Sequence, residues 1–73
     1  MDMRKLVGRN FARLRQAKGL TQEQVAARSG FSQQYISGLE SGKRNPTIIS
    51  LYELAASLDA GPIDLLGDPP GQD

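Results

Sequence analysis

Apolar side chains recur every three or four positions along most of this chain, which is the spacing of one face of an α-helix. The strict alternation of apolar and polar residues that is typical of a strand does not occur. The pattern predicts five helices, roughly over residues 4–18, 22–29, 33–41, 48–58 and 62–66. Glycines follow the segments, and we expect helices to end at Gly19, Gly30, Gly42 and Gly61. No internal repeat is visible.

Several of the predicted helices begin at residues suited to a helix start. Thr21 is a good N-cap, and Gln24 three residues later completes a capping box. Ser32 and Thr47 can cap the next two helices, and Pro62 stands at the first helical position, where its missing N–H does no harm. These signals fix the helix starts more firmly than the helix ends.

The apolar stripes predict a single small core. Residues 1–66 are expected to form one domain, and residues 67–73, rich in proline and glycine, a flexible tail. The residues expected to face inward are Val7, Phe11, Leu14, Val25, Ala26, Ile36, Leu39, Leu51, Leu54, Ala55 and Leu58.

Composition excludes several classes of function. The 73 residues contain neither cysteine nor histidine, so disulfides and thiolate metal sites are excluded and the commonest general base is missing. No nucleophile–base pair, phosphate-cradling glycine loop or carboxylate cluster stands out, and we expect no enzyme, metal or cofactor. No run of about 18 apolar residues suggests a membrane span, and no apolar stretch near the start suggests a secretory signal. We expect a cytoplasmic protein.

The charges are unevenly distributed, although the net charge is only +1. Residues 1–44 hold all nine basic residues and three acids, a net charge of +6. Residues 45–73 hold five acids and no base, a net charge of −5. This asymmetry suggests an end that faces an anionic partner and an end left for other contacts. Chance clustering on a solvated surface is the alternative.

The second and third helices are joined by only Gly30, Phe31 and Ser32, so they must cross steeply, as in a helix-turn-helix. This geometry requires a small residue where the helices approach, a residue that tolerates positive φ at the turn, and apolar residues holding the later helix in place. The four residues that meet these demands are Ala26, Gly30, Ile36 and Leu39.

The same segment resembles the helix-turn-helix of the phage repressor and Cro family, often called Xre-type. The run from Gly19 to Ala26 is similar to the family's second helix. The run from Tyr35 to Lys43, followed by Asn45-Pro46-Thr47, is similar to its third helix and loop. The resemblance covers residues 6–66. It implies an all-α, compact, five-helix, lambda-repressor-like domain that binds DNA.

The outward face of the third helix is polar but uncharged. At 100° per residue, Gln33, Gln34, Ser37, Gly38 and Ser41 fall on the side opposite Ile36 and Leu39. Gln can pair with adenine through two hydrogen bonds, and Ser can bond several base edges, so this face suits a major groove. The resemblance supports Gln33, Gln34 and Ser37 as base-contacting positions. Simple solvation of the helix is the alternative.

Gly38 departs from the pattern of the family that the sequence resembles, because the equivalent position often bears a longer side chain that contacts a base. Glycine there permits close approach of the backbone to a base or a thymine methyl group, or it narrows the set of bases contacted.

Phosphate contacts are expected on both sides of this face. Free N–H groups at the start of the second helix favour an anion near Thr21 and Gln22. On the other side, the phosphate-binding candidates are Ser41, Lys43, Arg44 and Asn45. The Tyr35 hydroxyl is a further candidate, with partial core packing as its alternative role.

The resemblance implies two further features. One is a partly buried ion pair between Arg15 and Glu40 that fixes the helices. The other is a homodimer that binds two half-sites about 34–36 Å apart. We expect the carboxy-terminal part to carry the dimer contact, through Ile63, Leu65 and Leu66, with Ile48, Ile49 or Tyr52 as additions. Alternatively, Ile63 and Leu66 close the core.

The sequence therefore predicts a small transcriptional regulator that binds double-stranded DNA, a repressor or autoregulator acting as a homodimer on a palindromic operator. Phage-like repressors and restriction–modification controllers are subtypes of this hypothesis. The alternative is an antitoxin or other protein-interaction module of the same fold, whose main partner is a second protein. The acidic half and the proline-rich tail favour that alternative.

Overall fold

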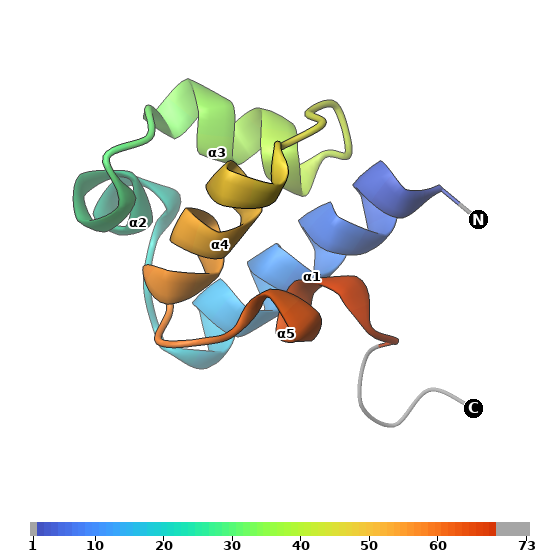
Figure 1. Cartoon of the computed structure of the whole chain (residues 1–73). Helices are drawn as coiled ribbons and strands as arrows, with labels where there is room; N and C mark the ends of the chain where they lie inside the picture. Colours follow the sequence, from blue (N-terminus) through green and yellow to red (C-terminus); the bar gives the residue numbers. More distant parts are fainter. Residues whose placement is uncertain (1, 69–73) are drawn as a thin grey trace.

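The helices predicted from the apolar pattern are present in the computed structural model, which describes residues 2–68 (Figure 1). Within these residues the chain is all-α, and its five helices are α1 (Met3–Ala17), α2 (Gln22–Ser29), α3 (Gln33–Glu40), α4 (Ile48–Ala56) and α5 (Pro62–Leu66). The expected tail falls mostly on residues 69–73, outside the described residues. None of the described helices has the length and apolar character needed to cross a membrane.

The helix starts follow the capping residues. Thr21 and Gln24 form the complete capping box, and the Ser32 and Thr47 side chains accept N–H groups of α3 and α4. α1 starts one residue earlier than predicted because Asp2 caps it, accepting the N–H groups of Arg4 at 3.0 Å and Lys5 at 3.3 Å. These backbone hydrogen bonds lower the pKa of Asp2.

The helix ends differ more from the sequence predictions. α1 ends at Ala17, α3 at Glu40 and α4 at Ala56, between one and two residues short of the predicted ends. The expectation that Gly61 ends a helix is wrong. The chain turns earlier, with Asp59 at φ 54°, and Gly61 is the N-cap of α5, donating its N–H to Asp64 Oδ2 at 2.8 Å.

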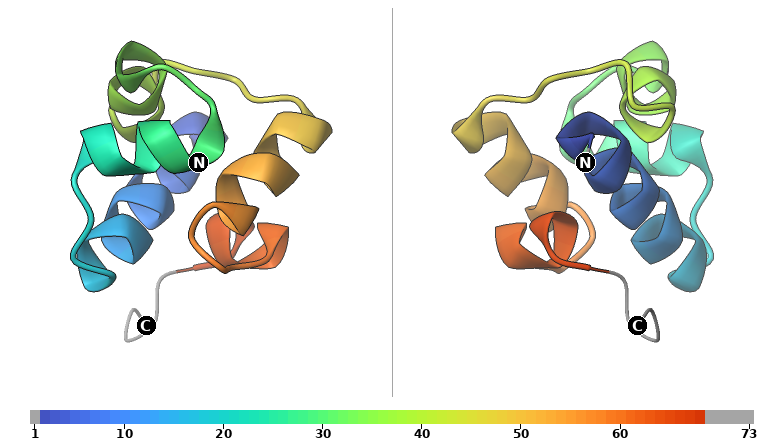
Figure 2. Two further views of the ribbon diagram at one scale, coloured as in Figure 1. Left: turned by 90° about the vertical axis from the view of Figure 1, so that its left-hand side faces the viewer. Right: turned by 90° about the vertical axis from the view of Figure 1, so that its right-hand side faces the viewer.

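The core lies between two groups of helices, with α1, α2 and α3 on one side and α4 and α5 on the other (Figure 2). The predicted inward stripes of α1, α3 and α4 supply most of it, and Leu14 and Ala26 pack against it half-buried. Its members are Val7, Phe11, Val25, Ile36, Leu39, Leu51, Leu54, Ala55, Leu58 and Leu65.

The turn between α2 and α3 has the predicted form. Gly30 adopts the left-handed conformation at φ 80° and donates its N–H to the Ala26 carbonyl at 3.0 Å. The Ser29 hydroxyl accepts the Phe31 N–H at 3.2 Å, and the Phe31 ring packs against the core. In Figure 1, α2 is seen nearly end-on while α3 runs across the view, so the two helices cross steeply.

α1 meets the end of α3 at a glycine. Gly8 is buried, and a Cβ atom there would collide with the Leu39 carbonyl oxygen and lie 3.0 Å from the Glu40 carbonyl oxygen. Hydrogen is therefore the only side chain that permits this approach. A lone glycine inside a helical pattern is compatible with close packing, but it does not identify the helix that approaches.

α1 also holds α5 through a buried amide. Asn10 is fully buried, and its Nδ2 donates to the carbonyl oxygens of Leu65 and Gly67, both at 2.8 Å. These hydrogen bonds satisfy backbone groups at the end of α5 that would otherwise lose their water partners. Asn10 lies on the same helical stripe as Val7, Phe11 and Leu14, so its position alone indicates burial.

Gly8→Ala is expected to lower the free energy of unfolding by about 2 kcal/mol, because overpacking against backbone atoms outweighs the roughly 1 kcal/mol by which alanine favours a helix. Chemical denaturation measures the change. The exposed neighbour Arg9 supplies the control, since Arg9→Ala removes no buried contact. A Gly8→Ala variant as stable as the parent would show that α1 and α3 do not touch here.

Candidate nucleic-acid interface

The outward face of α3 carries three exposed polar side chains, those of Gln33, Gln34 and Ser37. Together with Gln22 at the start of α2, they line an open hollow of about 370 Å³. All four are uncharged and can donate and accept hydrogen bonds, which suits contact with the mixed donors and acceptors of base edges. The structure thus brings together candidates that the sequence places on two different helices.

Behind this face, Glu40 ties three helices together. Arg15 of α1 donates to its carboxylate twice, from Nε to Oε2 at 2.6 Å and from Nη2 to Oε1 at 2.9 Å. Arg15 also donates to the Leu20 carbonyl at 2.7 Å, just before α2. The Arg15 and Glu40 side chains are only 12% and 9% exposed, and the hydrogen bonds to Glu40 raise the pKa of Arg15.

Gln22 is the third partner of Glu40. Its Nε2 donates to Glu40 Oε1 at 3.0 Å, so the ion pair fixes a side chain that lines the hollow. The sequence predicts Gln22 at a phosphate and Glu40 in an ion pair, but it does not predict the contact between them. Two residues 18 positions apart give no local signal of this contact.

The start of α2 retains part of its capacity to bind an anion. The capping box uses the backbone N–H groups of Thr21 and Gln24. The capping box does not use the backbone N–H groups of Gln22 and Glu23. No hydrogen-bond partner of these two groups is found among residues 2–68, so they remain available to an anion. Together with the positive end of the helix dipole, they form a local environment that favours a phosphate.

Tyr35 combines both of its expected roles in one geometry. Its half-buried ring packs against the core and lies 4.9 Å from the Phe31 ring, centroid to centroid. Burial raises the pKa of the Tyr35 hydroxyl. The hydrogen bond that Tyr35 makes to Ser32, at 3.0 Å, uses its backbone N–H and leaves the hydroxyl to other partners.

The loop after α3 presents Lys43, Arg44 and Asn45, all exposed. Asn45 lines a second open hollow with Asp2, Met3 and Arg4. Ser41 is exposed as well, but its hydroxyl donates to the Ser37 carbonyl at 2.6 Å. Ser41 would have to give up this hydrogen bond in order to donate to a phosphate.

Gly38 differs from its expected place on the open face. It is half-buried because the Arg44 side chain covers it. The helical wheel predicts only the direction of Gly38, and a side chain arriving from the following loop lies outside what such a wheel describes.

A separate apolar surface lies on α4 and α5, which pack against each other. It consists of five large exposed side chains: Ile48 (84% exposed), Ile49 (68%), Tyr52 (60%), Ile63 (80%) and Leu66 (42%). The expectation that Leu65 contributes to a dimer contact is wrong for this fold, because Leu65 is fully buried. The alternative that Ile63 and Leu66 close the core is also wrong.

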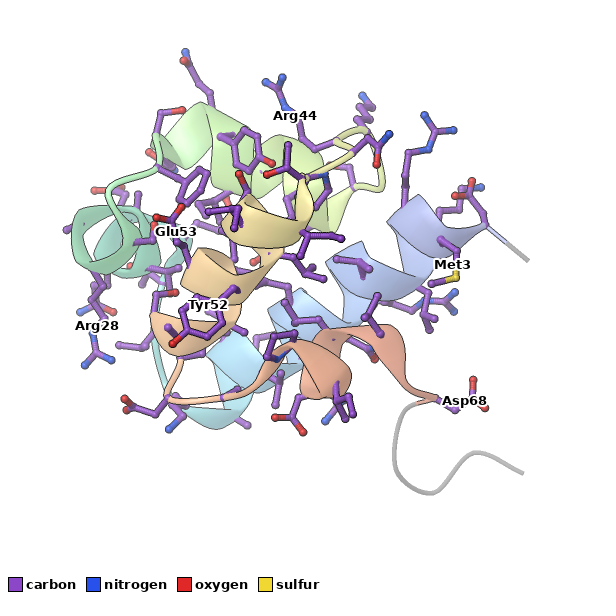
Figure 3. All side chains as sticks on the ribbon, viewed as in Figure 1. Met3, Arg28, Arg44, Tyr52, Glu53 and Asp68 are labelled. Carbon is purple, nitrogen blue, oxygen red and sulfur yellow. The ribbon has the colours of Figure 1, made fainter. Side chains whose placement is uncertain are left out.

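The polar face belongs to α2 and α3, whereas the apolar surface belongs to α4 and α5. Figure 3 places Arg44 above α3, whereas Tyr52 lies on α4 and Asp68 lies beyond α5.

Comparisons with known proteins identify relatives of this chain. Residues 11–66 match the helix-turn-helix family HTH_3. The chain is 70% identical over 66 residues to y4dJ of Sinorhizobium fredii, named an uncharacterized HTH-type transcriptional regulator. That alignment covers 90% of this chain and 86% of y4dJ.

Solved structures of restriction–modification controller proteins have the same fold. C.AhdI from Aeromonas hydrophila superposes with a TM-score of 0.81 at 39% identity, covering 85% of this chain and 94% of C.AhdI. C.Esp1396I, solved as a tetramer in complex with its natural 35 base-pair operator, superposes with a TM-score of 0.81 at 32% identity. That match covers 89% of this chain and 86% of C.Esp1396I.

Glu40→Ala is expected to lower the melting temperature sharply and to reduce the free energy of unfolding by about 3–5 kcal/mol, because it leaves the Arg15 charge nearly buried without its partner. Thermal unfolding followed by circular dichroism measures this. The matched control is Glu53→Ala, since Glu53 is an exposed carboxylate on α4. Equal melting temperatures for the two variants would contradict the structural role of Glu40.

Proposed function

The chain belongs to the helix-turn-helix family HTH_3, and from this premise we propose that it is a transcriptional regulator that binds double-stranded DNA at a specific operator. The observation that carries the proposal is the exposed, uncharged polar face of α3, set beside cationic and N–H donor groups. Both close comparisons support it, since one relative is named a transcriptional regulator and another was solved on its operator.

In the proposed complex α3 enters the major groove. Gln33, Gln34 and Ser37 contact base edges there, because their side chains are exposed and α3 is held rigidly from behind by Glu40. Amide side chains can pair with adenine through two hydrogen bonds at once, which discriminates between bases. A rigid helix adds specificity because little conformational entropy is lost when it binds.

Phosphates bind on either side of α3 in this proposal. One lies at the start of α2, near the free N–H groups of Gln22 and Glu23 and the hydroxyl of Thr21. Another lies near Lys43, Arg44 and Asn45, within reach of the Tyr35 hydroxyl. Phosphate contacts of this kind set the position of the helix in the groove but carry no sequence information themselves.

The operator is proposed to be palindromic and bound by a homodimer. The apolar surface of α4 and α5 is its contact, because isolated monomers rarely expose several large apolar side chains together. A two-fold axis through this surface lets each copy use the same residues. Because the polar face belongs to α2 and α3, a contact through α4 and α5 leaves the α3 helix of each copy for DNA.

Loss of a base contact and loss of a phosphate contact are expected to have different effects on DNA binding. Gln33→Ala and Gln34→Ala are each expected to relax sequence preference at one position per half-site, at a cost of about 1–3 kcal/mol. Lys43→Ala is expected to weaken binding to all sequences alike and to lower the salt dependence by about one released counterion. Selection of bound duplexes from a random library, followed by titrations at several salt concentrations, measures both effects.

Arg28→Ala is the matched control for charge, since Arg28 is exposed on α2 and points away from Arg44 (Figure 3). Its salt dependence should stay that of the parent. Sequence-blind losses of equal size from all three interface variants would contradict the assigned roles, and no binding to any duplex at low salt would reject the function itself.

Ile63→Asp is expected to convert the dimer to a monomer without unfolding it, because the Ile63 side chain is 80% exposed within one chain. Loss of the dimer should weaken operator binding by at least about tenfold, since the half-sites are then bound independently. Sedimentation equilibrium measures the association. The control for the association measurement alone is Met3→Asp, which changes an exposed apolar residue on α1 outside this surface.

A parent chain that stays monomeric at all concentrations tested would overturn the dimer proposal. It would favour the alternative in which the apolar surface binds a second, different protein.

A further inference from the structure

Gly38 lies under the side chain of Arg44. A Cβ atom at Gly38 would stand 2.9 Å from Arg44 Nε, 3.3 Å from its Cγ and 3.6 Å from its Cδ. The first two distances are closer than ordinary van der Waals contact. Any residue larger than glycine would therefore push the middle of the Arg44 side chain away from α3.

The loop after α3 turns back so that Arg44 can reach this place. The Lys43 N–H donates to the Gly38 carbonyl at 2.9 Å, and Gly42 adopts φ 76° just before it. These two features fix the backbone on which Arg44 stands. The Arg44 stem then runs back across the helix it has just left.

The far end of Arg44 lies over Tyr35. Its guanidinium carbon is 5.2 Å from the centroid of the Tyr35 ring, within the range of a cation–π interaction. Tyr35 and Gly38 are three residues apart, so they are neighbours on one side of α3. The Tyr35 ring is itself held by Phe31, at a centroid distance of 4.9 Å.

We propose that Gly38 and Tyr35 form a seat for Arg44, which holds the guanidinium beside the polar face of α3 as a pre-positioned ligand for one DNA phosphate. The inference rests on the proposed function. It also changes the role of Gly38, from a position that bases approach directly to a positioning residue that acts through Arg44.

The chemistry of guanidinium suits such a seat. Contact with an aromatic ring uses the flat face of the group, while its N–H donors point outward along the edges. These donors remain free to bond two oxygens of a phosphate. Because the side chain is already ordered, less rotamer entropy is lost when DNA binds, which is worth about 3- to 10-fold in affinity.

The test is a double-mutant cycle on Gly38→Ala and Arg44→Ala, with a duplex selected by the parent chain as the probe. Gly38→Ala is expected to weaken binding about 3- to 10-fold without lowering the melting temperature, because alanine favours a helix over glycine. Its salt dependence should fall toward that of Arg44→Ala, which loses about one counterion. In the Arg44→Ala background, Gly38→Ala should have no further effect.

Two results would overturn the seat. One is parental affinity for Gly38→Ala. The other is the same loss from Gly38→Ala with and without Arg44, which would mean that DNA approaches the Gly38 backbone directly. Both leave the proposed function standing, because the parent chain still binds its duplex. A parent chain that binds no duplex rejects the function and the seat together.

Discussion

The carboxylate of Glu40 is the interaction on which the arrangement of α1, α2 and α3 depends. It accepts two hydrogen bonds from Arg15 and one from Gln22, and Arg15 extends the network to the Leu20 carbonyl. Burying a charge this completely is unfavourable unless every partner is present. The network therefore tolerates few relative positions of the three helices. It therefore helps to fix the orientation of α3 relative to α1 and α2.

The Glu40 side chain contributes both to the stability of the fold and to the proposed DNA interface. Gln22 donates an amide hydrogen to Glu40, and it also lines the hollow together with Gln33 and Gln34. The same carboxylate thus supports the fold behind α3 and orients a polar group in front of it. A loss of DNA affinity caused by a change at Glu40 cannot be assigned to contact with DNA, because the orientation of α3 changes as well.

Local signals explain how much the sequence predicts. The starts of α2, α3 and α4 follow from Thr21, Ser32 and Thr47, because a cap acts on N–H groups two or three residues away. The exposed face of α3 follows from helical periodicity. What the sequence does not predict involves contacts between distant residues: Gly8 against the end of α3, Asn10 at the end of α5, and Arg44 across Gly38. Leu65 shows the same limit, since periodicity in a five-residue helix does not distinguish an inward from an outward side.

α1 connects the helices that carry the two surfaces of the proposed complex. Through Gly8 and Arg15 it fixes the end of α3, and through Asn10 it fixes the end of α5, which bears Ile63 and Leu66. These contacts are short and at least partly buried, so α1 ties the helices that carry the polar face to the helix that carries Ile63 and Leu66. Two copies joined through α4 and α5 would therefore hold their α3 helices at a fixed separation. A fixed separation is what allows a homodimer of so small a domain to distinguish the spacing of two half-sites as well as their bases.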